Sequence, residues 1–279
     1  MLTDKKVLFL GAGSMAEAMI AGMIKANKIP ITNITVSNHS NKERLVQLKT
    51  TYGINTAHRE QLNLEQADII VLAMKPKDVE KALYSFQHTL QPHQIVLSVL
   101  AGISTSFIEQ HTAKGQQVIR VMPNTSSAIG ESATAISSGK YTSQQNMEIA
   151  KELLACIGEV YVIEEKHMDG FTGLAGSGPA YIYYLMEHME KAGTQLGIPQ
   201  PISREIIAQT ILGAARMVQK QGEDPASLRQ KVTSPNGTTA AGLQALEDNG
   251  GGVAITEAVI QASGRSKNMS EQLLKTIVS

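Results

Sequence analysis

A Gly-x-Gly-x-x-Ala motif near the start of the chain holds residues that could bind the phosphates of a dinucleotide. It spans residues 11–16 and directly follows four apolar residues at 7–10. Gly11 permits a tight turn, Gly13 lets the backbone approach a pyrophosphate, and Ala16 lets the next helix pack closely on the strand. The first turn of that helix, with Ser14 and Met15, offers unpaired N–H groups and a partial positive charge. The alternative is a glycine-rich turn that joins a strand to a helix and binds no nucleotide.

The residues after the second predicted strand bear on which dinucleotide would bind. In an open α/β sheet, ligands bind beyond the carboxyl ends of the strands. The segment Ser37-Asn38-His39 has no Asp or Glu that would accept a hydrogen bond from the ribose 2′-hydroxyl of NAD. The small hydrogen-bonding side chains of this segment, together with His39 and the nearby Lys42, suit a 2′-phosphate better. We therefore expect NADP(H) rather than NAD(H). The alternative is an ordinary polar helix start capped by Ser40 or Asn41.

Three further strand ends complete the expected cofactor site. Lys75 stands beside the proline that ends its strand, at the rim where an anionic cofactor would lie, although a solvated lysine beside a turn is the alternative. Ala101 and Gly102 are small and leave room for a nicotinamide ring. Asn124 could hydrogen-bond a carboxamide or a water. We therefore expect cofactor contacts from Ala73, Lys75, Pro76, Ala101, Gly102 and Asn124.

Two loops in the second half of the chain each place a serine, a proline and a glycine before a helix. In the first, over 174–180, Pro179 takes the first helical position with Ser177 or Gly178 as the cap. The second loop, over 232–239, uses the same residue types. Such a helix start can hold a carboxylate with backbone amides and hydroxyls, without an arginine. Each loop alone is also typical of a cap in a tight turn, but both together beside a nucleotide domain favour a ligand site.

The elements that position these residues fall into two regions. Short apolar strands alternate with helical segments as far as residue 163, which predicts an α/β fold with a mainly parallel sheet. After the strand at 7–10 we expect strands at 33–37, 68–74, 94–100, 117–122, 133–137 and 159–163. Between them we expect helices at 42–51, 79–89, 104–111 and 143–156.

Beyond residue 165 the strand pattern disappears. We expect helices at 178–196, 202–221, 225–232, 238–247 and 253–278. The predicted organisation is therefore a dinucleotide-binding Rossmann-like domain over 1–164 and an all-α domain over 165–279. The helix over 180–192 is apolar around much of its circumference, so it is either the core of its own domain or packs against a partner chain.

Composition excludes several classes of function. The 279 residues carry 25 basic and 25 acidic side chains and no Trp, so nothing favours nucleic acid or an anionic membrane. No apolar run approaches about 20 residues, which argues against a signal peptide or a membrane helix. The lone Cys156 cannot form an intrachain disulfide; we expect a small buried hydrophobe in a reducing, cytoplasmic setting.

Metal and acyl-transfer chemistry find no support. The seven histidines are scattered without a zinc-binding spacing, so we expect no metal site. Neither Ser177 nor Ser234 stands in a Gly-x-Ser-x-Gly motif.

Five segments together resemble the pyrroline-5-carboxylate reductase family. They lie at 11–15, 73–76, 122–125, 176–181 and 232–243, in the order that the family has, and the last two are the more specific. The resemblance implies NAD(P)H-dependent reduction of 1-pyrroline-5-carboxylate to L-proline, the last step of proline biosynthesis. It also implies a C-terminal helical domain that interlocks two subunits into a homodimer, which in this family commonly assembles to a decamer.

The resemblance also implies roles for residues of the two loops. Thr239 would be the catalytic residue, because its Oγ would hydrogen-bond the ring nitrogen. The substrate would be bound by Gly178, Pro179, Ala180, Val232, Ser234, Gly237, Thr238 and Thr239, joined by residues of the partner subunit in the family's arrangement.

Three positions depart from the family's usual residues. His39 stands where the family often has Arg, which weakens the case for a 2′-phosphate, and Ser126 replaces a Pro. Asn236 replaces the first Gly of Ser-Pro-Gly-Gly. Because Asn tolerates left-handed backbone better than most residues, we expect the loop to keep its shape.

Two other functions remain as alternatives. A 3-hydroxyacid dehydrogenase of similar plan would carry an Asn four residues after a catalytic Lys, whereas Lys191 is followed by Gln195. A non-catalytic NADP-binding regulator could use the same fold, and the intact segment 234–239 counts against it.

Overall fold

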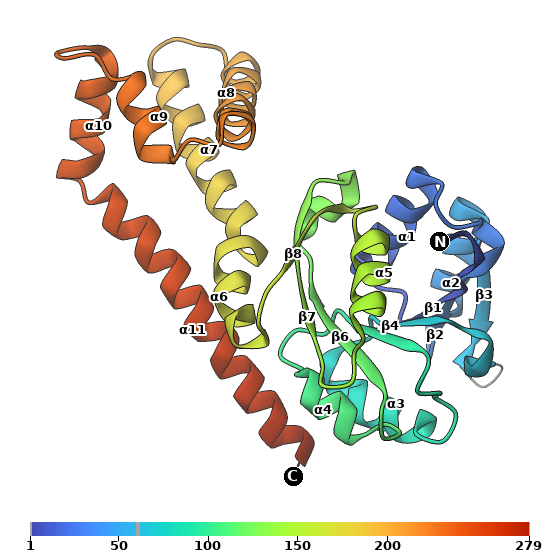
Figure 1. Ribbon diagram of the computed structural model, residues 1–279. Helices are drawn as coiled ribbons and strands as arrows, with labels where there is room; N and C mark the ends of the chain where they lie inside the picture. The colour runs from blue at the N-terminus through green and yellow to red at the C-terminus, as the bar shows by residue number, and fades with distance from the viewer. Residues whose placement is uncertain (1, 60–61, 279) are drawn as a thin grey trace. The chain divides into compact units, whose positions relative to one another are not determined.

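The computed structural model describes residues 2–59 and 62–278 (Figure 1). Contacts within the chain divide it into two compact units. One unit is Met1–Ser177 together with Gln261–Ser279, and the other is Gly178–Ile260. Each unit is described separately below.

The first unit is built on one eight-stranded sheet with the order β3-β2-β1-β4-β5-β6-β7-β8. Every pair of neighbours is parallel except β6 and β7, so the prediction of a mainly parallel sheet is confirmed. The strands are β1 (Val7–Leu10), β2 (Ile34–Asn38), β3 (Asn55–His58), β4 (Ile69–Leu72), β5 (Ile95–Ser98), β6 (Gln117–Met122), β7 (Ser132–Ser138) and β8 (Gly158–Val162).

Strand β3 is the one element of the sheet that the sequence did not predict. It lies at the edge, pairs in parallel with β2, and has no fully buried residue. Its four residues, Asn-Thr-Ala-His, contain no apolar run. Because an apolar run is the signal by which a buried strand is recognised, the sequence could not predict β3.

Helices cover both faces of the sheet, and two hydrophobic clusters lie between the layers. Val7 and Phe9 of β1 belong to one cluster, and Leu8 and Leu10 belong to the other, as the alternation of a strand buried on both faces requires. The helices of this unit are α1 (Ser14–Ala26), α2 (Lys42–Tyr52), α3 (Val79–Phe86), α4 (Thr105–Gln110), α5 (Gln144–Leu154) and α6 (Met168–Phe171), with 3₁₀ turns at Leu2–Asp4, Ile31–Asn33, Leu64–Gln66, Pro76–Asp78, Thr125–Ile129 and Glu165–His167.

The part of the chain after β8 is helical, as expected. A π-helical turn, η8 (Thr172–Gly176), follows α6. It is followed by α7 (Gly178–Gln195), α8 (Gln200–Gln221), α9 (Pro225–Lys231), α10 (Thr238–Asp248) and α11 (Gly251–Val278). Within the described ranges 2–59 and 62–278, no helix combines the length and the apolarity needed to cross a bilayer.

Helix α7 exposes its apolar side chains rather than burying them. It has no buried residue, and Tyr183 and Tyr184 are 63% and 66% exposed. Its polar side is tied to α8, where Arg204 donates two hydrogen bonds to Glu190 at 2.8 and 3.0 Å. The helix is therefore not buried as the core of its own domain, and its packing against a partner chain stays a prediction.

Cys156 is expected to react slowly with thiol reagents. It is half-buried, and burial raises the pKa of its thiol; Lys28 lowers that pKa by a smaller amount, and Glu152 raises it slightly. Because the thiolate is the nucleophile, we expect DTNB to modify the native protein at pH 7.5 at least about tenfold more slowly than the protein in guanidinium. Equal rates in the two states would contradict this placement of the cysteine.

Candidate functional site

The glycine-rich turn between β1 and α1 is fixed by its neighbours in the sheet. The N–H of Gly11 donates to the Ser37 carbonyl at 2.9 Å, and the N–H of Ala73 donates to the Leu10 carbonyl at 2.9 Å. Gly11 has φ +122°, and a Cβ there would lie 2.3 Å from the Ala73 oxygen. The turn thus requires glycine at this position for its conformation and for its close approach to the end of β4.

The start of α1 presents backbone N–H groups that the helix itself does not use. Gly13 is the N-cap and has no side chain that could cap the helix. The first hydrogen bond of the helix runs from the Glu17 N–H to the Gly13 carbonyl at 3.0 Å, so the N–H groups of Ser14 and Met15 have no acceptor within the helix. Met15 packs its side chain against the core and can contribute through its backbone. This is the arrangement that binds phosphate.

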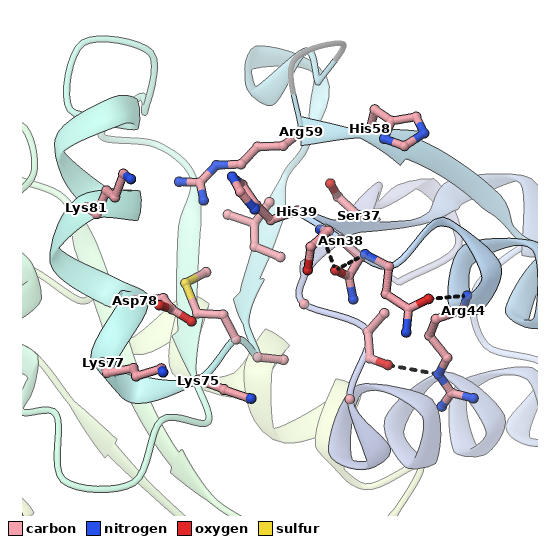
Figure 2. A pocket seen from close by; sticks show the side chains of 18 of the residues that line it. Ser37, Asn38, His39, Arg44, His58, Arg59, Lys75, Lys77, Asp78 and Lys81 are labelled. Atoms are coloured by element: carbon pink, nitrogen blue, oxygen red, sulfur yellow. Dashed lines mark hydrogen bonds between the residues drawn. The ribbon is translucent and has the colours of Figure 1, made fainter.

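A cleft of about 1770 Å³ opens at the carboxyl ends of β1, β2, β3 and β4 (Figure 2). Nine residues predicted to contact a cofactor line it: Gly11, Gly13, Ser14, Ser37, Asn38, His39, Ala73, Lys75 and Pro76. The other four predicted cofactor residues, Met15, Ala101, Gly102 and Asn124, are not among the lining residues. The cleft therefore brings together three separate segments of the sequence at the carboxyl ends of the strands, where the cofactor site was predicted.

The loop after β2 is shaped by two asparagines. The Asn38 Oδ1 accepts hydrogen bonds from the N–H groups of Ser40 and Asn41 at 3.1 and 3.2 Å. Asn41 in turn caps α2 by accepting from the Arg44 N–H at 2.9 Å, so the polar helix start is confirmed. The capped loop leaves His39 exposed on the wall of the cleft, and a contact of this segment with a 2′-phosphate stays a prediction.

Several basic residues of the cleft escaped the sequence analysis: Arg44, His58, Arg59, Lys77 and Lys81. Arg44 serves the framework, because its Nε donates to the Ala12 carbonyl at 3.0 Å and its guanidinium forms an ion pair with Glu17. Tyr52 donates to the same carboxylate at 3.2 Å, and burial, then Glu17, raises the pKa of Tyr52. These contacts hold α2 against the glycine-rich turn.

Asn124 is engaged in the framework rather than in the cleft. Its buried side chain accepts from the Ser126 N–H at 3.1 Å and donates from Nδ2 to the Ala175 carbonyl at 3.1 Å. Pro179, four residues after Ala175, has no N–H with which to satisfy that carbonyl. Asn124 thus compensates for the proline, and its contact with a cofactor stays a prediction.

The loop after β5, with Ala101 and Gly102, is closed in from one side by α11. Gly102 has φ +79°, and a Cβ there would lie 3.1 Å from the Ser270 Oγ. Downstream, Glu165 accepts hydrogen bonds from the N–H and Oγ1 of Thr105 at 2.8 and 2.6 Å and pairs with the buried Arg120 at 3.4 Å. These contacts hold the downstream end of the loop at Thr105.

As predicted, a helix begins at this segment, with Pro179 in the first turn of α7, but Ser177 lacks the extended backbone of a usual N-cap. Ser177 has helical backbone angles, φ −88° and ψ −17°, and its N–H donates to the Thr172 carbonyl at 2.8 Å across the π-helical turn. The π-helical turn ends at Gly176 and α7 begins at Gly178, so only Ser177 separates the two. Gly178 and Pro179 are half-buried and Ala180 is exposed in the first turn of α7.

The second loop does form an open helix start. The Gly237 N–H donates to the Ser234 carbonyl at 3.0 Å, which closes a turn with Pro235 at its second position. Gly237 is the N-cap of α10 and forms no side-chain cap hydrogen bond. Val232, Ser234, Thr238 and Thr239 are all exposed. Hydroxyls and unused N–H groups thus gather at one helix N-terminus, as carboxylate binding requires.

Asn236 takes the left-handed conformation that its position demands, with φ +58°, so the loop keeps a turn that glycine would also form. We expect Asn236→Gly to leave stability and substrate KM within about twofold. Asn236→Val should cost about 1–2 kcal/mol, because a β-branched residue resists this backbone conformation. Thermal unfolding and steady-state kinetics check both variants, and a neutral Asn236→Val would show that the loop relaxes freely.

Models of known families match both parts of the chain. Residues 165–269 match the model described as pyrroline-5-carboxylate reductase dimerisation. Residues 6–102 match the model described as NADP oxidoreductase, coenzyme F420-dependent.

Curated relatives extend the match over nearly the whole chain. Pyrroline-5-carboxylate reductase 1 of Bacillus subtilis is 59% identical over 273 residues, which cover 98% of this chain and 92% of the relative. Pyrroline-5-carboxylate reductase 2 of the same organism is 42% identical, with 96% of each chain covered. The Arabidopsis thaliana reductase is 35% identical over 95% of this chain and 96% of its own.

Solved structures agree with the sequence relatives. The Plasmodium falciparum pyrroline carboxylate reductase with NADP bound has a TM-score of 0.86 at 28% identity, with 97% of this chain and 100% of that chain covered. The 1-pyrroline-5-carboxylate reductase of Streptococcus pyogenes has a TM-score of 0.84 at 31% identity, with 95% and 98% covered. With a Rossmann-like sheet, two open helix starts and this full-length likeness, the chain belongs to the pyrroline-5-carboxylate reductase family.

Proposed function

We propose that this protein reduces 1-pyrroline-5-carboxylate to L-proline, the last step of proline biosynthesis, with NADPH as the preferred donor. The observation that carries the proposal is 59% identity to a named reductase over nearly the full length of both chains. The NADP in the P. falciparum relative and the basic cleft of this chain support the choice of cofactor.

The cofactor site is proposed at the cleft beside the glycine-rich turn. The open start of α1, with Gly13, Ser14 and Met15, would bind the pyrophosphate through backbone N–H groups. Lys75 lies at the rim of the cleft, where its charge favours the same anion. Ala101, Gly102 and Asn124 remain the proposed surroundings of the nicotinamide, which supplies the hydride when it is bound.

The substrate site is proposed at the loop before α10. Ser234, Gly237, Thr238 and Thr239 would bind the substrate carboxylate with hydroxyls and N–H groups. The Thr239 Oγ would also hydrogen-bond the ring nitrogen, while Gly178, Pro179, Ala180 and Val232 line the pocket, with residues of a partner subunit. A protonated cyclic imine is already electrophilic, so the chain's main task is to hold the reacting carbon in place and to exclude water.

The organisation proposed for the whole protein follows the same relationship. A cofactor domain over 1–164 and a substrate and dimerisation domain over 165–279 accord with the family model that begins at residue 165. The exposed apolar face of α7 supports a homodimer through the helical domain. We propose further assembly to a decamer and a cytoplasmic location.

One assay separates this function from its rivals. Purified protein with 1-pyrroline-5-carboxylate should oxidise NADPH, followed at 340 nm, and should show no reduction of NADP⁺ with 3-hydroxy acids. Lys191 is exposed and pairs with Glu187 at 2.6 Å, which gives no support to a dehydrogenase lysine. Activity with 3-hydroxy acids alone would favour the dehydrogenase, and silence in both directions would favour a non-catalytic regulator.

A further inference from the structure

Arg59 lines the cleft beside the glycine-rich turn, and neighbouring residues fix the orientation of its side chain. It follows β3 directly, and its Nη2 donates to the Ser85 Oγ at 3.0 Å. That hydroxyl donates onward to the Ala82 carbonyl at 2.7 Å, so it is fixed as an acceptor for the guanidinium. The guanidinium carbon also lies 4.9 Å from the centre of the buried Phe86 ring. Two residues of α3 thus orient the arginine.

Most of the hydrogen-bonding capacity of Arg59 is unused by the residues that the structure describes. A guanidinium has five N–H donors, and Ser85 accepts from one of them. Asp78 interacts with it electrostatically, yet no carboxylate of residues 2–59 and 62–278 lies within ion-pair distance. Arg59 is half-buried, and burial lowers the pKa of its guanidinium, although arginine remains protonated.

The register of the sheet places Arg59 beside the loop that distinguishes the two dinucleotides. Asn38 of β2 pairs with His58 of β3, so His39 and Arg59 are the next residues beyond the same edge of the sheet. Figure 2 shows the Arg59 side chain extending from β3 toward His39 and the helix that carries Lys81. In Rossmann folds the ribose 2′-position lies beyond the end of β2, and an arginine nearby can accommodate a 2′-phosphate.

The arginine nearest in sequence to this loop is committed elsewhere. Arg44 uses its Nε for the Ala12 carbonyl, its Nη1 for Gln47 and its Nη2 for Glu17. Its charge is balanced by the Glu17 carboxylate and its donors point into the framework. It is therefore poorly suited to a phosphate on the ligand.

We propose that Arg59, oriented by Ser85 and Phe86 and assisted by His39, binds the 2′-phosphate of NADPH and sets the preference for NADPH over NADH. The inference rests on the proposed cofactor site. It explains how a chain with His39 in place of the family's frequent arginine can prefer NADPH, because the cation comes from the residue that follows β3.

Nucleotide fragments test the inference without the reaction. Calorimetry with 2′,5′-ADP and 5′-AMP should show tighter binding of 2′,5′-ADP to the unaltered protein. Arg59→Gln should weaken 2′,5′-ADP about 10- to 100-fold, as loss of a charged hydrogen-bonding partner does, and change 5′-AMP less than about twofold. Arg59→Lys should lie between, since it keeps the charge but loses the planar fork.

Controls separate a specific contact from general charge or misfolding. Lys77→Gln removes one charge from the same cleft and should weaken both nucleotides by a similar small factor. Unchanged thermal unfolding of Arg59→Lys would show that the fold is intact. In kinetics, the ratio of kcat/KM for NADPH to that for NADH should fall in Arg59→Gln, mainly through KM for NADPH.

The outcomes distinguish this inference from the proposed function. An Arg59→Gln protein that keeps its discrimination between 2′,5′-ADP and 5′-AMP would overturn the role of Arg59, and so would unaltered protein that shows none. Either result leaves pyrroline-5-carboxylate reduction standing. Lack of reductase activity together with an Arg59-dependent preference for 2′,5′-ADP would overturn the proposed function and support the inference.

Discussion

Replacing Thr239 by alanine is expected to lower kcat for 1-pyrroline-5-carboxylate about 100-fold while KM changes little. The hydroxyl is proposed to hydrogen-bond the ring nitrogen, whose charge changes as hydride reaches the neighbouring carbon. An interaction that matters most in the transition state appears in kcat, and loss of one well-placed donor or acceptor costs about 10² to 10³ in rate. Steady-state kinetics with NADPH held at saturation measure the effect.

Ser234→Ala provides the matched comparison on the same loop. Its hydroxyl is proposed to bind the carboxylate, which does not change in the reaction, so the loss should raise KM about tenfold and leave kcat nearly unaltered. Thr239→Ser, which keeps a hydroxyl, should recover most of the activity. Wild-type kinetics for both alanine variants would remove the substrate from this loop.

Replacing Gly11 by alanine is expected to damage both the fold and cofactor binding. A Cβ at Gly11 would lie 2.3 Å from the Ala73 oxygen, and φ +122° is unfavourable for any side chain. Strain and overpacking together should lower the free energy of unfolding by about 2–5 kcal/mol. Urea denaturation measures the stability, and fluorescence titration measures the dissociation constant of NADPH.

Gly13→Ala separates the two effects. No described atom lies within 4 Å of a Cβ built at Gly13, and its φ of −75° suits any residue, so stability should stay within about 1 kcal/mol. The new methyl group would instead meet the pyrophosphate, and the Kd for NADPH should rise at least about tenfold. Normal NADPH binding by Gly13→Ala would place the pyrophosphate away from this turn.

Much of the sheet could be predicted because its strands are buried on both faces. Such strands appear as unbroken apolar runs, and Ile69–Leu72 is an example with all four residues buried. The edge strand β3 lacked that signal. The π-helical turn before α7 was missed for a different reason, because Gly176, Gly178 and Pro179 look like a stop and a new start when their hydrogen bonds are unknown.

The candidate site was predicted where a local motif defines it. The turn at 11–14 and the helix start at 237–239 depend on neighbouring residues, and both have the expected form. Arg59 depends on the pairing of β3 with β2 and on two residues of α3, contacts that no short motif encodes. The framework role of Asn124 could not be predicted, because its hydrogen bond to Ala175 spans 51 positions of sequence.

Transfer of deuterium from labelled NADPH tests the central claim most directly. Reactions with 1-pyrroline-5-carboxylate and NADPH deuterated at either the 4R or the 4S position should yield proline, analysed by NMR and mass spectrometry. One of the two labels should appear at C5 of proline, the former imine carbon, with none at the α-carbon. Proline without deuterium from either donor, or with deuterium at the α-carbon, would contradict hydride transfer to the cyclic imine.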